Sequence, residues 1–182
     1  MDRLIKSLPF LLAALACAPS SAADVSCAQQ MGQQRATLLA RQCRQVSSAT
    51  HPPCNAANSC AMIIDEFERG CDLLAGESYR PKFCDTKARA GAFQGYLFSG
   101  GGSDANQVTV LTDKGERIHA YCSQLCDDLF SEPDDHDVVA LRENLVGRRV
   151  AVEVTIERNA GRIPGPGDGD RIPLVKHIRL LK

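Results

Sequence analysis

Residues 149–157 have the sequence RVAVEVTIE, in which an apolar residue stands at every second position. The side chains of a β-strand point alternately to its two faces, so one face of this segment is aliphatic and the other is polar. A strand of this kind covers a hydrophobic core with its aliphatic face. The alternation therefore predicts a half-buried strand whose inner residues are Val150, Val152, Val154 and Ile156.

Four further segments with a strand-like composition lie on either side of this one. Strands rich in β-branched and aromatic residues are usually bounded by Gly, Pro, Asn or Asp, and these segments cover residues 92–99, 107–112, 117–121 and 173–181. Residues 138–146 predict a helix that ends at Gly147. Residues 85–182 are thus predicted to form three strands, a helix and two strands.

This order of elements resembles the OB-fold, and Gly95, which interrupts the first strand, is part of the resemblance. The resemblance covers roughly half of the chain and implies a five-stranded barrel with a groove for extended ligands. It does not imply one function, because many functions share this fold. The binding loops that it implies join the first two and the last two strands, and the candidate ligand- or partner-contacting residues are Gly101, Ser103, Asp104, Arg162, Asp168, Asp170 and Arg171.

Residues 24–84 have a helical pattern and contain six cysteines. Ser26 to Gln29 is a capping box that begins one helix, and the apolar face of this helix continues to Val46. A second helix begins after Asn58 or Ser59 and carries Cys60, Ile64, Phe67 and Cys71 on one stripe. The chain is therefore predicted to be an α+β protein, in which a disulfide-rich helical hairpin (24–84) precedes an OB-like β-barrel (85–182).

Eight of the nine cysteines follow residue 23, and an even number behind an export signal predicts a disulfide framework. The simplest geometry for the hairpin is a nested pair of bridges, Cys43 to Cys60 and Cys27 to Cys71, among the 105 pairings that eight cysteines allow. Four cysteines remain: Cys54 and Cys84 in the hairpin, and Cys122 and Cys126 in the second half. At least one bridge from Cys54 or Cys84 to this later pair is expected to join the two halves.

Residues 1–23 have the pattern of a secretory signal peptide with a cleavage site before Asp24. The mature protein is therefore expected in the periplasm or outside the cell. An alternative is open, because residues 13–17 resemble a lipobox in which Cys17 would be lipidated. The protein would then be an outer-membrane lipoprotein, and this is the only route by which a membrane contact is expected.

The balance of charge argues against a nucleic-acid partner, since the formal net charge is −1. Acidic residues concentrate in residues 112–137 and basic residues in residues 138–182, which gives a local dipole without a strong basic excess. The aromatic residues that could stack on bases are few: Phe93, Tyr96, Phe98 and Tyr121.

No segment has the spacing of a known catalytic motif. Cys122 and Cys126 are separated by three residues, so they fit neither the CxxC of a redox site nor a usual zinc spacing, and both are predicted to be structural. No catalytic residue, metal site or cofactor is therefore predicted. The glycines after residue 99 resemble GxGxxA, but a strand follows them where a dinucleotide site needs a helix.

Two hypotheses about function follow. The first is an exported, disulfide-stabilised, non-enzymatic binding module for a protein or an envelope glycan, with an inhibitor, immunity or envelope-accessory role. The alternative is a small secreted hydrolase or toxin, possibly dependent on a metal ion. Its active residues would lie in the acidic cluster around His136, which comprises Asp134, Asp135, His136 and Asp137.

Overall fold

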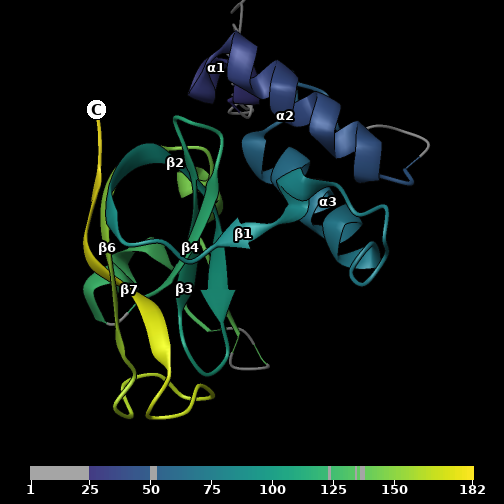
Figure 1. The fold of residues 1–182 in the computed structure, drawn as a ribbon. Helices are drawn as coiled ribbons and strands as arrows, with labels where there is room; N and C mark the ends of the chain where they lie inside the picture. The colour runs from purple at the N-terminus through teal and green to yellow at the C-terminus, as the bar shows by residue number, and fades with distance from the viewer. Residues whose placement is uncertain (1–24, 50–52, 123, 134, 136–137) are drawn as a thin grey trace, which may run out of the picture.

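The computed structural model describes residues 25–49, 53–122, 124–133, 135 and 138–182. Within them the protein is an α+β protein in which three α-helices pack beside a closed five-stranded β-barrel (Figure 1). The predicted fold class is therefore confirmed. The predicted signal peptide, residues 1–23, lies outside the described residues.

The helical part consists of α1 (Cys27–Met31), α2 (Gln33–Val46) and α3 (Cys60–Leu73). The predicted capping box is confirmed, because the Ser26 side chain accepts a hydrogen bond from the Gln29 amide and the Gln29 side chain bonds back. Ser59 caps α3 by accepting from the amide of Met62. The first predicted helix is divided at Gly32, whose φ of 87° turns the chain between α1 and α2.

A glycine allows α2 and α3 to approach closely. A Cβ atom added at Gly70 would lie 2.7 Å from the carbonyl oxygen of Val46. We expect Gly70→Ala to destabilise the protein by about 1–3 kcal/mol, because overpacking outweighs the gain in helix propensity. Chemical denaturation would measure the loss. Gly169→Ala, where the nearest atom would lie 3.8 Å away, is the control, and equal stability of both variants would contradict this packing.

The five strands of the barrel are those that the sequence predicts. They pair antiparallel in the order β4-β3-β2-β6-β7, and a parallel contact between Tyr121 of β4 and Leu174 of β7 closes the barrel. Val150, Val152 and Val154 are buried as predicted, and Ile156 is half-buried. The strand bounds are β2 (Gly91–Gly102), β3 (Gln107–Thr112), β4 (Arg117–Tyr121), β6 (Arg149–Arg158) and β7 (Arg171–Leu180), with a short β1 (Thr86–Lys87) beside β4.

The described residues between β4 and β6 form helical turns but no α-helix. The helix predicted over residues 138–146 is therefore wrong. The helical turns that the structure describes there are the 3₁₀ helices η2 (Gln124–Leu129) and η3 (Glu143–Leu145). Between them, β5 (Val139–Ala140) pairs with the end of β2. A Cβ at Gly101 would lie 2.4 Å from the carbonyl oxygen of Val139, so the glycine permits this pairing in place of a helix.

All eight predicted cysteines form disulfides, but the predicted connectivity is wrong. The bridges are Cys27–Cys60, Cys43–Cys54, Cys71–Cys84 and Cys122–Cys126. The N-terminal ends of α1 and α3 lie together, as the 2.7 Å hydrogen bond from the Cys27 amide to the carbonyl of Asn58 shows. Cys27 therefore meets Cys60 and not Cys71, and no bridge joins the hairpin to the later pair. Four disulfides indicate an oxidising compartment.

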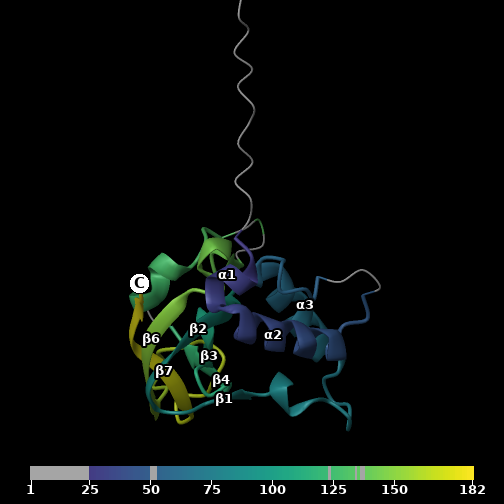
Figure 2. The ribbon, with the colours of Figure 1, turned by 90° about the horizontal axis from the view of Figure 1, so that it is seen from above.

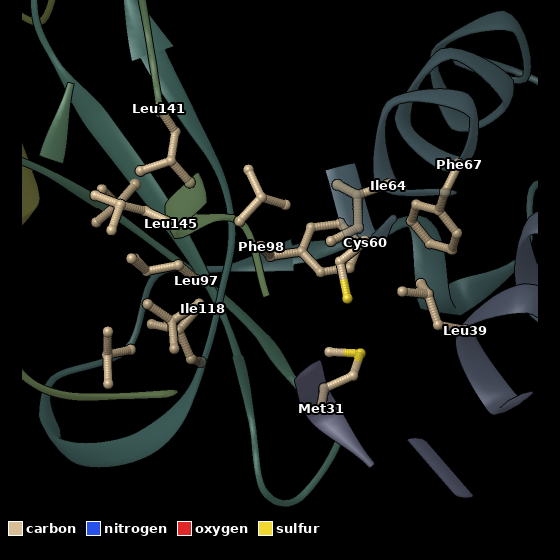
Figure 3. Close-up of a cluster of buried hydrophobic side chains, with 14 of the residues drawn as sticks. Met31, Leu39, Cys60, Ile64, Phe67, Leu97, Phe98, Ile118, Leu141 and Leu145 are labelled. Carbon is tan, nitrogen blue, oxygen red and sulfur yellow. The ribbon is translucent and has the colours of Figure 1, made fainter. Parts of the chain in front are cut away.

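The helices and the barrel share one hydrophobic core instead of a covalent bridge. Met31, Leu39 and Phe67 of the helices belong to the same buried cluster as Leu97 and Ile118 of the barrel (Figure 3). The view from above shows the helices lying along one side of the barrel (Figure 2). Burial of this shared apolar surface is what holds the two parts together.

An ion pair crosses the same interface. Arg117 of β4 is only 8% exposed, and its Nη2 lies 2.7 Å from Oε1 of Glu68 on α3. Its guanidinium carbon lies 5.1 Å and 4.8 Å from the ring centroids of Phe67 and Phe98. Burial raises the pKa of Glu68 and lowers the pKa of Arg117, because desolvation disfavours both charges. Each charged group is therefore stabilised at this buried position by the other.

Candidate functional site

The loops predicted to bind a ligand meet at one end of the barrel. Asp104, which follows β2, and Arg162, which follows β6, both line a groove of about 450 Å³. The turn that begins with η2 contributes Leu125 and Asp127, and β7 contributes Lys176. We call this the loop groove, and its remaining lining residues are Ala105, Asn106, Cys122, Ile163, Pro164, Leu174 and Val175.

The apolar floor of the loop groove is a small core of its own. Ile163, Ile172 and Leu174 form a separate buried cluster, against which Ala105 and Tyr121 pack. Ile163 comes from the long connection between β6 and β7, so its burial holds that connection against the barrel. The groove is therefore built on packed side chains and not on unsupported loops.

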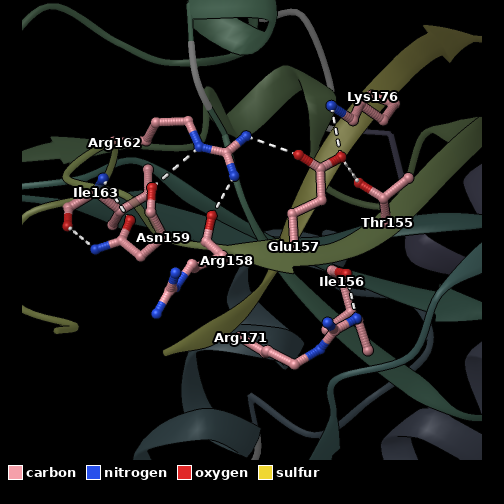
Figure 4. Close-up of polar contacts among 9 residues, drawn as sticks. All are labelled: Thr155, Ile156, Glu157, Arg158, Asn159, Arg162, Ile163, Arg171 and Lys176. Carbon is pink, nitrogen blue, oxygen red and sulfur yellow. Dashed lines mark hydrogen bonds and ion pairs between the residues drawn. The ribbon is translucent and has the colours of Figure 1, made fainter. Parts of the chain in front are cut away.

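Asn159 fixes the shape of this connection from within (Figure 4). It is fully buried, and its Nδ2 donates to the carbonyls of Ile163 and Pro166 at 2.9 and 2.8 Å. Its Oδ1 accepts from the Ile163 amide at 2.9 Å. A buried polar side chain is tolerated because its hydrogen bonds are made, and here they replace backbone pairing inside a loop.

Replacing Asn159 with alanine should loosen the connection. The loss of buried hydrogen bonds should cost roughly 2 kcal/mol locally, which corresponds to about a thirtyfold loss of hydrogen-exchange protection at the Ile163 amide. NMR-detected exchange would measure it. Asn144→Ala, at an exposed asparagine, serves as the control. Unchanged protection at Ile163 in Asn159→Ala would show that the side chain does not organise the loop.

The two cations of the groove already have a partner. Nη1 of Arg162 and Nζ of Lys176 each lie 2.7 Å from an oxygen of Glu157, and the Thr155 hydroxyl donates to the same carboxylate at 2.8 Å (Figure 4). Hydrogen bonds from Lys176, Arg162 and Thr155 lower the pKa of Glu157 to about 2. One carboxylate balances one of these two cations, so one positive charge remains in this cluster.

The low pKa of Glu157 predicts how acid affects this cluster. The folded value of about 2 lies below the ordinary 4.5, so the stabilisation is complete above the ordinary pKa and is lost as the pH falls towards 2. NMR titration of the Glu157 carboxyl carbon should give a midpoint near 2. Lys176→Gln should raise the midpoint and Lys182→Gln should not. A wild-type midpoint near 4.5 would rule out this arrangement.

The lining also includes two carboxylates without partners among the described residues. Asp104 and Asp127 line the groove, and neither makes an ion pair or a side-chain hydrogen bond with any residue that the structure describes. Asp127 lies in η2 and is exposed. With Glu157 counted, three carboxylates (Asp104, Asp127 and Glu157) stand against two cations (Arg162 and Lys176), so the net charge at the loop groove is −1.

The other predicted residues shape the loops and do not line the groove. Gly101 lies within β2 and pairs with Ala140, and Ser103 is exposed where the loop begins. The carbonyl of Asp168 accepts from Ala160, and the side chain of Asp170 accepts from Gly167. Nη2 of Arg171 donates to the carbonyl of Ile156.

Leu125, Asp127 and Lys176 belong to the groove but were not predicted from the sequence. The nearest signal for the first two is the short spacing of Cys122 and Cys126, since their bridge closes a tight turn that carries Leu125. The alternative site around His136 is not tested, because Asp134, His136 and Asp137 lie outside the described residues. Asp135 is described, and it is exposed in a turn.

None of the helices in the described ranges has both the length and the apolar character needed to cross a membrane. Comparisons of the chain with known protein families, with curated proteins and with solved structures find no match.

Proposed function

We propose that this protein is an exported, disulfide-stabilised, non-enzymatic binding module that holds an extended segment of another protein in the loop groove. The observation that carries the proposal is the groove itself, in which an apolar floor lies beside two carboxylates, Asp104 and Asp127, that have no partner among the described residues. Sites that bind ligands combine a mostly apolar concave surface with a few polar groups that orient the ligand. Such a module would suit an inhibitor, an immunity protein or an accessory of an envelope complex.

The lining favours a polypeptide over a glycan. No aromatic side chain is among the described residues that line the groove, so they offer no ring on which a sugar could stack. Leu125 is 61% exposed, and with the exposed Pro164 it offers aliphatic surface of the kind that side-chain stems cover. The two unpaired carboxylates favour a lysine or arginine, whose stem can lie on this surface while its charge meets Asp104 and Asp127.

A nucleic-acid ligand is not supported. Phosphate groups would be repelled by the uncompensated carboxylates of the groove. Two of the few aromatic residues are also engaged elsewhere: Phe98 is buried against Phe67, and Tyr96 lies beneath the guanidinium groups of Arg35 and Arg149.

Reversal of charge in the groove tests the proposal. Wild type, Asp104→Lys/Asp127→Lys and the control Glu132→Lys/Asp135→Lys would each be used as bait in envelope extracts and on a glycan array. The control makes the same change in charge at exposed residues outside the groove. We expect at least one envelope protein to bind to the wild-type bait and to the control bait but not to the groove variant. Equal retention by all three baits, or binding of a glycan alone, would contradict the proposal.

A further inference from the structure

A second groove lies between α2 and the turn that joins β3 to β4. Its volume is about 810 Å³, and we call it the helix groove. It is lined by Arg35, Leu38 and Arg41 of α2, Tyr96 of β2, and Asp113 and Lys114 of the turn. β3 runs from the loop groove to this turn, so its residues separate the two grooves by roughly 20 Å at the usual rise of a strand.

Positive charge exceeds negative charge in the helix groove. Asp113 is the one acidic side chain of the lining, and two arginines share it. Nη2 of Arg35 lies 3.6 Å from Oδ1 of Asp113, and Nη2 of Arg149 donates to Oδ2 at 2.8 Å. Both guanidinium groups also lie over the Tyr96 ring, with carbon-to-centroid distances of 4.9 and 5.0 Å. One carboxylate therefore balances only one of these two fixed cations.

Two further cations at the groove form no ion pair with the described residues. The side chains of Arg41 and Lys114 are exposed, and neither forms an ion pair or hydrogen bond with any other residue in the described ranges. Glu116 is near enough to Lys114 for an electrostatic interaction, but its carboxylate is already paired with Lys87 and Arg89. The N-terminus of α2 adds to the potential, because Gly32 supplies no side-chain cap and no acidic residue lies in the first turn. The positive charge thus comes from the side chains of two elements and from the end of a helix.

We propose that the helix groove binds an acidic segment of a partner protein. Complementary charge selects aspartate and glutamate side chains, which Arg41 and Lys114 can reach without breaking an existing pair. Leu38, at 41% exposed, offers an apolar contact beside them, which a polypeptide can meet with a neighbouring side chain. This inference does not rest on the proposed function of the loop groove, since no residue is shared between the two linings.

The test uses the full mature protein and a fluorescent peptide of alternating Glu and Gly, with the Lys and Gly peptide as comparison. Anisotropy would measure affinity at low and at physiological ionic strength, and amide chemical shifts would locate the site. The groove variant is Arg41→Gln/Lys114→Gln. The control is Arg158→Gln/Arg179→Gln, which removes the same charge at exposed residues outside the helix groove.

We expect the acidic peptide to bind and to shift the amides of residues 33–38 and 113–115. The groove variant should weaken binding about tenfold, the sum of two exposed charge contacts, and the control by less than about twofold. Added salt should weaken binding to wild type. No binding at low ionic strength, equal weakening by both variants, or shifts confined to another surface would each overturn the proposal.

Discussion

Glu68→Ala is expected to lower the free energy of unfolding by about 3–5 kcal/mol, because it leaves a buried arginine without its partner. Arg117 is 8% exposed and lies between the helices and the barrel. Its Nε already has no hydrogen-bond partner among the described residues, and only Nη1 would keep one, the carbonyl of Cys84. The loss would be measured by urea denaturation monitored by circular dichroism.

Two further variants separate the charge from the packing at this position. Glu68→Leu/Arg117→Met removes both charges and should cost much less than Glu68→Ala, since replacing a buried pair with apolar side chains is often neutral. Glu77→Ala removes an exposed carboxylate on the hairpin and should leave stability nearly unchanged. If Glu68→Ala cost no more than Glu77→Ala, the ion pair would not join the helices to the barrel.

Loss of the Cys27–Cys60 bridge is expected to have the largest effect among the disulfides. Its cysteines are 33 residues apart, against 4 for Cys122–Cys126. A disulfide stabilises chiefly by restricting the unfolded chain, and the usual relation gives about 4 kcal/mol for the long loop and about 2 kcal/mol for the short one. Denaturation of Cys27→Ala/Cys60→Ala and of Cys122→Ala/Cys126→Ala would measure both.

The same two variants also test the connectivity. If Cys27 and Cys60 were not partners, their removal would leave two other cysteines unpaired, and free-thiol counting of the variant would detect them. A variant with no free thiol and the larger loss of stability agrees with the bridge found here. A larger loss of stability in Cys122→Ala/Cys126→Ala than in Cys27→Ala/Cys60→Ala would contradict the expected ranking.

Local patterns predict the strands of this protein well, because each strand carries its own evidence. The alternation in residues 149–157 depends only on neighbouring residues, and it is confirmed in β6. The helix expected over residues 138–146 was wrong because the structure of this segment depends on a residue far away in the sequence. Val139 and Ala140 extend because Gly101, far away in the sequence, leaves room for their backbone.

The disulfide pairing also depends on contacts that no local pattern contains. Cys60 and Cys71 share a face of α3, so the sequence leaves open which of them meets Cys27. Gly32 determines the pairing because it ends α1 after Met31. Cys27 therefore lies at the end of α3 that carries Cys60. The covalent link expected between the two halves is replaced by a shared core.

Part of the candidate site was predictable, and part was not. The resemblance to an OB-fold selects the loops that carry Asp104 and Arg162, and both residues line the loop groove. Asp127 and Lys176 come from other elements, and only the closure of the barrel at Tyr121 and Leu174 brings those elements together. The helix groove was not predicted, since it needs the helices to be placed against the barrel.

The claim that the loop groove is the binding surface is tested most directly by photo-crosslinking. A photoreactive phenylalanine would replace Leu125, which lines the groove, or Leu73, which is 63% exposed at the end of α3 and serves as the control. The proposal predicts a discrete protein adduct from position 125 that is absent from position 73 and is lost in Asp104→Lys/Asp127→Lys. Adducts of equal yield from both positions, or none from position 125, would contradict it.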